Sequence, residues 1–229
     1  MFRTIRSLSP DKTRVIIVDD HPLVCASLKG LINAEPDLEV CATVSDADEA
    51  LAQIIALEPA LALIDISLKG ANGLDLIKKL REHFAAQPTQ GTRILVISAR
   101  EELLFAPRAL NAGARGYIKK DAELTQILQA VRAVLNGEIY LSAAMTERLL
   151  LDSRQRANDT QFPKVASLTD RELEVFELIG NGLSTAAIAE RLRLSIKTIE
   201  THQANIKRKL RLENHIELTR EAMQWMMDK

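Results

Sequence analysis

Acidic side chains follow two short apolar segments of the sequence. Asp19 and Asp20 come directly after the apolar run at residues 15–18, and Asp65 comes directly after the run at residues 61–64. Such runs predict buried β-strands, and neighbouring parallel strands end at the same edge of a sheet. Carboxylates crowded at one edge repel one another unless a hard cation lies between them. The three acids together therefore predict a Mg²⁺ site, although each acid alone is also consistent with a solvated turn.

A hydroxyl and an ammonium group are expected at the same edge. Ser98 follows the apolar run at residues 94–97, and Lys120 follows the run at residues 116–118. The ammonium group could serve only to neutralise the acids, and it could also bind a phosphoryl group as a point charge. With a carboxylate nucleophile and a metal ion, these side chains are the parts needed to accept and hold a phosphoryl group.

Apolar runs and helical patterns alternate five times between residues 14 and 137. Strands are expected at residues 15–18, 38–44, 61–64, 94–97 and 116–118, and helices at residues 22–33, 46–57, 74–84, 101–112 and 122–135. This alternation predicts an α/β fold, a doubly wound five-stranded parallel sheet with helices on both faces. Ligands of such domains bind at the carboxyl ends of the strands, where the acids are expected.

The strand patterns stop after residue 137. Residues 142–156 predict one more helix, and the polar stretch at residues 157–163 indicates a domain boundary. Beyond it, Thr169 and Glu172 have the spacing of a capping box, and Ser184 and Ser195 are expected N-caps. Four helices are expected, ending at residues 179, 191, 210 and 227. The C-terminal part is therefore predicted to be all-α.

Four segments at the predicted carboxyl edge resemble the receiver domain of two-component response regulators. They are residues 18–21 (VDDH), 65–74 (DISLKGANGL), 97–99 (ISA) and 113–121 (GARGYIKKD). The resemblance implies that Asp65 is the phosphoacceptor, that Asp20, Asp65 and the Ser67 carbonyl ligate Mg²⁺, and that Asp19 acts mainly through water. It also implies roles for three further residues: a switch hydroxyl, a rotating aromatic ring and a phosphate-contacting cation, namely Ser98, Tyr117 and Lys120. Lys69 stands where the family usually has proline, which alters the loop but removes no reactive group.

Basic residues are concentrated near the C-terminus. The chain as a whole has a net charge of -1, but residues 191–211 contain seven basic residues against the single acid Glu200, a net of +6. The seven are Arg191, Arg193, Lys197, Lys207, Arg208, Lys209 and Arg211. A merely solvated helix would carry compensating acids, so this local excess indicates a polyanion-binding surface. Its place after a helix, a turn and a serine N-cap is typical of a helix-turn-helix.

The same region resembles the LuxR-type helix-turn-helix. The matching segments are residues 168–175 (LTDRELEV), 179–189 (IGNGLSTAAIA) and 195–210 (SIKTIETHQANIKRKL). A receiver followed by this module is the organisation of the NarL/FixJ group of response regulators. The expected organisation is an N-terminal tail (1–13), a flavodoxin-like receiver (14–137), a linker helix and linker (138–163), and a four-helix LuxR-type domain (164–229).

Residue roles on the predicted recognition helix follow from spacing and from the resemblance. Helical spacing places four apolar residues in the core, Leu192, Ile199, Ile206 and Leu210, and leaves six others facing outward, Lys197, Glu200, Thr201, Gln203, Ala204 and Lys207. By resemblance, base edges are read by Glu200, Thr201 and Ala204. Phosphate contact or positioning is expected from Lys197, Thr198, His202, Lys207 and Lys209. None of the four histidines has metal-binding spacing.

The last helix has more apolar residues than it can bury against so small a domain. The resemblance makes it the contact of a homodimer on DNA, and the expected contact residues are Ile216, Met223 and Trp225.

These patterns predict a cytoplasmic transcription regulator that takes a phosphoryl group from a sensor histidine kinase and binds promoter DNA. No membrane-spanning stretch is expected, and Cys25 and Cys41 lack the spacing of a disulfide framework or a zinc site. An enzyme is not expected. Two alternatives stay open: a small aspartyl-phosphate phosphotransferase or phosphatase using Asp65, which would leave the basic helix unexplained, and a regulator that acts independently of phosphorylation, which should have lost one of the acids or Lys120.

Overall fold

The computed structural model describes residues 12–68, 72–85, 91–154 and 164–227 of the 229-residue chain. The chain divides into two compact units, which are described separately below. The first consists of residues 1–68, 72–100 and 109–142, and the second of residues 69–71, 101–108 and 143–229.

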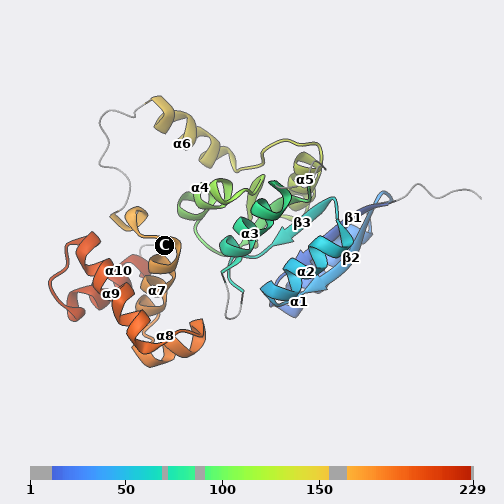
Figure 1. The fold of residues 1–229 in the computed structure, drawn as a ribbon. Helices are drawn as coiled ribbons and strands as arrows, with labels where there is room; N and C mark the ends of the chain where they lie inside the picture. Colours follow the sequence, from blue (N-terminus) through green and yellow to red (C-terminus); the bar gives the residue numbers. More distant parts are fainter. Residues whose placement is uncertain (1–11, 69–71, 86–90, 155–163, 228–229) are drawn as a thin grey trace, which may run out of the picture. The chain divides into compact units, whose positions relative to one another are not determined.

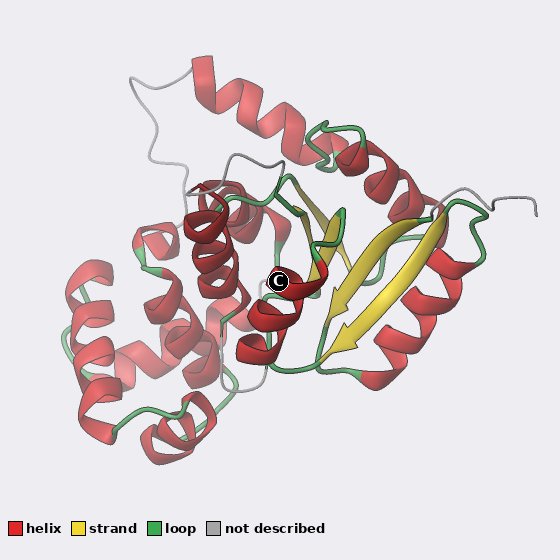
Figure 2. Cartoon of the chain, turned by 45° about the vertical axis from the view of Figure 1, so that its right-hand side comes forward, coloured by secondary structure: helices red, strands yellow, loops and turns green. Residues whose placement is uncertain are grey.

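A parallel five-stranded sheet forms the centre of the first unit (Figures 1 and 2). Its strands are β1 (Thr13–Val18), β2 (Leu38–Val44), β3 (Leu61–Ile64), β4 (Arg93–Ser98) and β5 (Gly116–Lys119), in the order β2-β1-β3-β4-β5. All four neighbouring pairs are parallel. The predicted doubly wound α/β fold is confirmed, and β1 and β3 are adjacent, as the acidic site requires.

Helices cover both faces of this sheet. One face packs against α1 (Pro22–Asn33) and α5 (Leu124–Leu135), whose apolar side chains join those of β1, β3, β4 and β5 in one buried cluster. On the other side, α2 (Ala47–Leu57) packs on β1 and β2 and contacts α3 (Gly73–Ala85). Strands buried on both faces explain why their sequences are continuously apolar rather than alternating. The connection from β4 to β5 contains α4 (Glu102–Ala112).

The first unit extends beyond the boundary expected at residue 137. Tyr140 forms a parallel bridge with Gly116, accepts a hydrogen bond from the Tyr117 amide (2.9 Å) and donates one to the Arg115 carbonyl (3.0 Å). Residues just after α5 therefore line the edge of the sheet at β5. The pairing involves a single residue, so it leaves no recognisable pattern in the sequence.

The second unit is helical. It contains α6 (Ala143–Arg154), a short 3₁₀ turn (Lys164–Ser167), α7 (Asp170–Gly180), α8 (Thr185–Leu192), α9 (Ile196–Leu210) and α10 (His215–Met227). The capping box predicted for α7 is present: the Thr169 hydroxyl accepts from the Glu172 amide (3.3 Å), and Glu172 Oε2 accepts from the Thr169 amide (2.8 Å). Helix α7 packs against α8, α9 and α10, which together bury an apolar core.

None of the helices within the described residues combines the length and apolar character needed to cross a bilayer. Cys25 and Cys41 are free thiols and half-buried.

Candidate functional site

Backbone hydrogen bonds continue the sheet ladder past the strand ends and fix the acidic residues in place. The Asp65 amide donates to the Val18 carbonyl (2.8 Å), and the Asp19 amide donates to the Val44 carbonyl (3.0 Å). The Lys120 amide donates to the Ser98 carbonyl (3.0 Å). Because these bonds belong to adjacent strands, the side chains that the sequence places after β1, β3 and β5 meet at one edge, as predicted.

One lysine joins two of the three carboxylates. Lys120 Nζ lies 2.8 Å from Asp65 Oδ2 and 2.6 Å from Asp19 Oδ2, and both aspartates are only 1% exposed. The other oxygen of Asp65, Oδ1, is buried and has no hydrogen-bond partner. A buried carboxylate oxygen without a partner is costly, so this atom is one that a ligand would stabilise.

The charge of Lys120 is maintained by its partners. Burial by itself would lower the pKa of Lys120, but the hydrogen bonds and negative charges of Asp19 and Asp65 raise that pKa above its ordinary value. The side chain is therefore an ammonium group at neutral pH, a cation held beside the free oxygen of Asp65.

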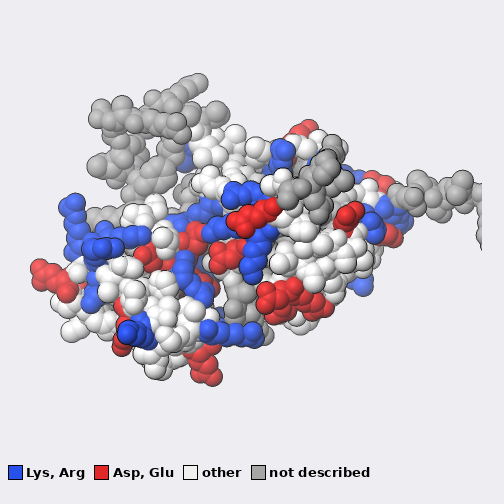
Figure 3. Space-filling model, in the orientation of Figure 1, with Lys and Arg blue, Asp and Glu red and all other residues white. Residues whose placement is uncertain are grey.

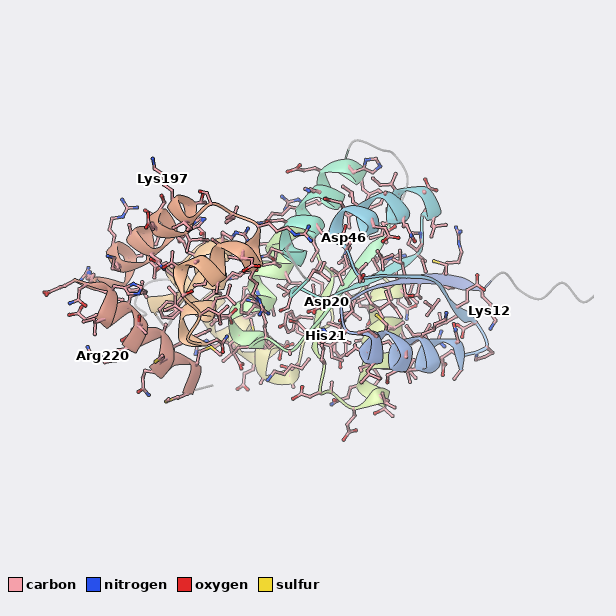
Figure 4. All side chains as sticks on the ribbon, turned by 90° about the horizontal axis from the view of Figure 1, so that it is seen from below. Lys12, Asp20, His21, Asp46, Lys197 and Arg220 are labelled. Atoms are coloured by element: carbon pink, nitrogen blue, oxygen red, sulfur yellow. The ribbon has the colours of Figure 1, made fainter. Side chains whose placement is uncertain are left out.

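The acids fit a hard divalent cation. Ligand-type atoms of Asp19, Asp20, His21 and Asp65 all lie within 4.8 Å of one another, and carboxylate oxygens are the ligands that Mg²⁺ prefers. His21 was not predicted as part of the site, but its Nδ1 lies 3.1 Å from Asp19 Oδ1 and 2.9 Å from Asp20 Oδ1. Figure 4 shows Asp20 and His21 side by side where β1 ends. The signal for His21 was only its position, directly after the two acids.

The loop after β3 folds tightly against Asp65. The Gly73 amide donates to the Ile66 carbonyl (2.9 Å), and a Cβ placed on Gly73 would lie 2.2 Å from the Asp65 carbonyl oxygen. Only glycine allows this close backbone approach. Asn72 accepts from the Leu74 amide (2.9 Å) at the start of α3. Lys69, the departure noted in the sequence, lies outside the described residues.

In the helical unit, α8 and α9 form the predicted helix-turn-helix. Ser184 Oγ accepts from the Ala187 amide (3.3 Å), and Ser195 Oγ accepts from the Thr198 amide (3.1 Å), so both predicted N-caps are confirmed. The four residues predicted to form the core of this motif are buried, namely Leu192, Ile199, Ile206 and Leu210.

The prediction that Gln203 faces outward is wrong. Gln203 is 8% exposed, and its amide donates to Thr185 Oγ1 of α8 (3.2 Å). It lies four residues after Ile199 and three before Ile206, so helical geometry places it on the buried stripe despite its polarity. The hydrogen bond to α8 satisfies the buried amide and joins the two helices.

Comparisons with known proteins agree with this geometry in both units. Residues 15–132 match the response regulator receiver domain family, and residues 166–222 match the family described as bacterial regulatory proteins, luxR family. The oxygen regulatory protein NreC of Staphylococcus carnosus is 34% identical over 92% of this chain and 96% of its own. A nitrate/nitrite response regulator protein homolog of Haemophilus influenzae is 32% identical over 91% of this chain and 95% of its own.

The chain is a LuxR-type response regulator. Among solved structures, it resembles RcsB from Salmonella enterica serovar Typhimurium bound to promoter rprA in the presence of the phosphomimetic BeF3⁻, with 25% identity and a TM-score of 0.63 over 92% of this chain and 98% of that one. The response regulator described here is therefore a DNA-binding transcription regulator, with the acidic site in its receiver domain and α8 and α9 in its LuxR-type domain.

Ser98 and Tyr117 of the receiver are both buried and both contact the loop that follows β4. Ser98 Oγ accepts from the Arg100 amide (3.2 Å), and Tyr117 donates its hydroxyl hydrogen to the Arg100 carbonyl (2.9 Å). Arg100 Nε in turn donates to Ser67 Oγ (2.8 Å), in the loop that carries Asp65. Arg100 was not predicted from the sequence, where its only signal is its place two residues after Ser98. Tyr117 already occupies an inward position in this structure.

The residues of α9 expected to contact phosphate differ in whether they already have partners within the LuxR-type domain. Lys197 is exposed, and Figure 4 shows it pointing away from its helix. Lys209 is instead paired with the buried Glu172 (2.6 Å), and Thr198 bonds its own N-cap serine. His202 is half-buried, and burial followed by the charge of Arg171 lowers its pKa below the usual value. Among the five residues expected to contact phosphate, Lys197 and Lys207 are therefore the cations that have no ion pair with another described residue.

Other residues expected to read DNA lie on the exposed face of α9. Glu200, Thr201 and Ala204 are exposed, and Thr201 donates its hydroxyl to the Lys197 carbonyl (2.9 Å). Figure 3 shows that basic side chains reach the surface of the helical domain at several places, with acidic side chains between them. On the face shown, the domain surface is therefore mixed in charge, and α9 is distinguished by its own excess of basic residues.

The three residues of α10 expected at a dimer contact lie on two different faces of the helix. Ile216 and Met223 are 79% and 39% exposed, and both line an open groove together with Thr219, Arg220 and Met227. Trp225 is half-buried, with its ring 5.7 Å from that of Phe176 in α7. Trp225 thus contributes to the core of its own domain, whereas Ile216 and Met223 form an exposed apolar face.

Proposed function

We propose that Asp65 accepts a phosphoryl group from a sensor histidine kinase, with Mg²⁺, and that this modification promotes binding of promoter DNA by a homodimer in the cytoplasm. The observation that supports the first step is the buried, partnerless Oδ1 of Asp65 beside the charged Lys120. A carboxylate held in this way is a nucleophile, and the neighbouring ammonium group can stabilise the negative charge of the incoming phosphoryl oxygens.

The transfer is a displacement at phosphorus. A carboxylate oxygen of Asp65 forms the new P–O bond while the P–N bond to the donor histidine breaks, and the departing imidazole nitrogen keeps the electron pair and takes up a proton. By resemblance, Mg²⁺ would be held by Asp20, Asp65 and the Ser67 carbonyl, with Asp19 acting through water. The ion supplies positive charge that reduces the repulsion between the anionic donor and the anionic acceptor.

The test uses intact-mass measurement after incubation of the full chain with acetyl phosphate. The wild-type protein should gain one phosphoryl group in the presence of Mg²⁺ and none in the presence of a chelator. Asp65→Asn should gain none, and Asp75→Asn, which changes an exposed carboxylate of α3, should label normally. Undiminished labelling of Asp65→Asn would overturn the assignment of the phosphoacceptor.

The phosphoryl group changes the surroundings of Ser98. It adds about -1.5 to -2 charges and strong acceptor oxygens, which draw the Ser98 hydroxyl away from the Arg100 amide. Because Tyr117 already lies inward and donates to the Arg100 carbonyl, the response is expected in the loop around Arg100 rather than as a rotation of the ring. Amide hydrogen exchange should change at residues 98–104 on phosphorylation, and identical exchange there would contradict this mechanism.

Promoter DNA is bound by the exposed face of α9. Glu200, Thr201 and Ala204 are proposed to contact base edges, and Lys197 and Lys207 to contact phosphates. These side chains are exposed or half-buried and have no ion pair with another described residue. Glu200 can accept a hydrogen bond from cytosine N4 in the major groove. The exposed apolar face of α10 is the proposed contact between two copies, which places two recognition helices on one duplex.

Mapping of bound DNA in cells tests the regulatory half of the proposal. The wild-type protein should occupy a limited set of promoters under conditions that favour phosphorylation, and Asp65→Asn should lose occupancy at the same sites. Equal occupancy by the two proteins would reject control by Asp65 while leaving DNA binding itself intact.

A further inference from the structure

Six residues of the described chain have a positive φ angle, and each lies at or just after the C-terminal end of a helix. Three of them are glycine and three have side chains. Glycine occupies this position after α4, α5 and α7, at Gly113, Gly137 and Gly182 (φ 126°, 85° and 79°). Residues with side chains occupy it after α2, α8 and α9, at Glu58, Arg193 and Arg211 (φ 43°, 52° and 59°). The two helices of the helix-turn-helix therefore both end in a left-handed arginine.

The left-handed conformation disfavours any residue that has a Cβ atom, and glycine adopts it freely. Glycine closes three other helices of this chain, so arginine is an energetically unfavourable choice at the ends of α8 and α9. Backbone strain of this kind is commonly retained where the side chain has a use. We assign that use to the guanidinium group, since both arginines are exposed.

Within the described part of the chain, neither guanidinium group is used to stabilise the protein itself. Arg193 and Arg211 have no side-chain hydrogen bond or ion pair among the described residues. Neighbouring cations are employed differently: Arg171 binds Glu174 (2.7 Å) and the Leu192 carbonyl (3.3 Å), and Lys209 binds Glu172. The domain thus satisfies its structural ion pairs with other basic residues and leaves these two strained arginines free.

Both arginines lie at the ends of α9. Arg193 is two residues before the N-cap Ser195, and Arg211 is the C-cap residue. Arg211 also continues the exposed stripe of α9, because it follows Lys197, Thr201, Ala204 and Arg208 in steps of three and four residues.

The length of α9 places these ends near the sugar-phosphate strands. Its 15 residues span about 22 Å at 1.5 Å per residue, whereas the major groove of DNA is only about 12 Å wide. A straight helix of that length cannot keep both of its ends at the floor of a curved groove, so the ends rise towards the phosphates that border it.

We propose that Arg193 and Arg211 are phosphate-binding residues that anchor the two ends of α9 to the DNA backbone, and that the chain accepts left-handed strain at both positions to present them. This inference rests on the proposed DNA-binding face of α9. The ligand is the phosphate backbone of duplex DNA, independent of its sequence.

The test measures how DNA affinity depends on salt. The full chain, treated with acetyl phosphate and Mg²⁺, is titrated onto a fluorescein-labelled duplex of about 24 bp. Its sequence is arbitrary, and its length accommodates two copies bound one helical turn apart. Affinity is measured by anisotropy between about 50 and 200 mM salt. Each substitution removes one phosphate contact from each of the two bound copies, so Arg193→Gly and Arg211→Gly should each reduce the slope of log K against log salt by about 1.8, and the double variant by about 3.6.

Matched variants separate charge from backbone conformation. Arg193→Lys and Arg211→Lys keep the charge and the strain, so they should retain most of the salt slope. Glu58→Gly relieves the same left-handed strain in the receiver and should leave the slope unchanged.

Stability is read separately through Trp225, the single tryptophan of the chain, which packs on Phe176 of the LuxR-type domain. The urea midpoint from its fluorescence should stay equal or rise in the two arginine-to-glycine variants. Reduced salt slope together with a lowered midpoint would overturn the proposal, because the loss of binding would then reflect damage to the fold.

An unchanged slope in both glycine variants also overturns the proposal. Lys197→Ala distinguishes this failure from failure of the DNA-binding face itself. If Lys197→Ala reduces the slope and the arginine variants do not, only the anchoring role is lost; if none of the variants changes it, the assignment of α9 is wrong.

Discussion

The two charged regions of this response regulator are built in opposite ways. In the receiver, Asp19, Asp65 and Lys120 are buried and contact one another, and the backbone ladder of the sheet holds them. On α9, Lys197 is exposed and has no ion pair within the described residues. The buried site is prepared for a small charged group that must be held tightly, whereas the exposed surface leaves its charge available to a large polyanion. Each region can be tested through the charge that distinguishes it.

The largest expected effect concerns the buried site. Replacing Lys120 with methionine leaves Asp19 and Asp65 without their shared cation, and loss of one partner of a buried ion pair typically costs about 3 kcal/mol. Urea unfolding followed by far-UV circular dichroism should show this loss in the receiver transition. Added Mg²⁺ should restore part of it, because the ion replaces the missing positive charge.

Lys119→Met is the matched control for this prediction. Lys119 precedes Lys120 at the end of β5, and the ammonium group that pairs with Asp19 and Asp65 is that of Lys120. Its replacement should leave the unfolding midpoint without any part that Mg²⁺ restores, because the paired cation of Asp19 and Asp65 is retained. Equal unfolding midpoints for Lys120→Met and wild type would show that the acids are not held by this lysine.

A second large effect concerns the exposed apolar face of α10. Met223→Asp places a charge in the proposed contact between two copies, and a DNA-binding monomer loses the effective concentration of the second half-site, worth about 100-fold in apparent affinity. Sedimentation and mobility-shift titration on a mapped promoter should both report the loss. A variant that bound DNA as a dimer with wild-type affinity would reject α10 as the contact.

Trp225→Phe provides the contrast within the same helix. Because Trp225 packs on Phe176, its replacement should reduce the stability of the LuxR-type domain and leave the association of two copies unchanged. The two variants together separate the inner face of α10 from its outer face.

The buried site was predictable from the sequence because topology determines it. Once β1 and β3 are adjacent parallel strands, Asp19 and Asp65 must meet at their carboxyl ends, whatever the details of side-chain packing. The strands, the helices and the capping box of α7 were predictable because local sequence patterns specify them: apolar runs, helical periodicity and the spacing of Thr169 and Glu172. Strand-end geometry places a lysine at this edge, and the resemblance to receiver domains selects Lys120, three residues after Tyr117, over its neighbour Lys119.

Tertiary contacts that cross between elements could not be predicted in this way. The sequence shows that Gln203 is polar but not that Thr185 of α8 lies opposite it and satisfies its amide. It counts Lys209 with the free cations, although the fold pairs it with Glu172. Arg100 was overlooked because its contact, Ser67, is 33 residues away. In each case the missing information is which side chain lies opposite, and one sequence alone does not contain it.

A third, intermediate effect distinguishes two lysines of α9. Lys209→Met leaves the buried Glu172 carboxylate without its cation and should lower the stability of the LuxR-type domain by about 2 kcal/mol, with little change in the salt dependence of DNA binding. Lys197→Ala should do the reverse, reducing the salt slope by about 1.8, one phosphate contact in each of two bound copies, with stability unchanged. Trp225 fluorescence and salt titrations measure the two quantities. If Lys209→Met reduced the salt slope as much as Lys197→Ala, Lys209 would contact DNA, and its ion pair with Glu172 would not withhold it from DNA.

The smallest expected effect is a loss of stability of the LuxR-type domain in acid, in two steps. Burial and the charge of Arg171 lower the pKa of His202 below its usual value near 6.5, so the folded state resists protonation and loses stability as the pH falls below about 6.5. Burial would raise the pKa of Glu172, but the hydrogen bond from Lys209 lowers it below the ordinary value near 4.5; this contribution is present above that pH and is lost as the pH falls below it. Urea midpoints from Trp225 fluorescence, measured from pH 7.5 down to about pH 4, should therefore decline first through the histidine and then through the glutamate. Glu172→Gln should abolish only the lower step and His202→Gln only the upper one. A single decline that survived both substitutions would show that other groups govern the acid response of this domain.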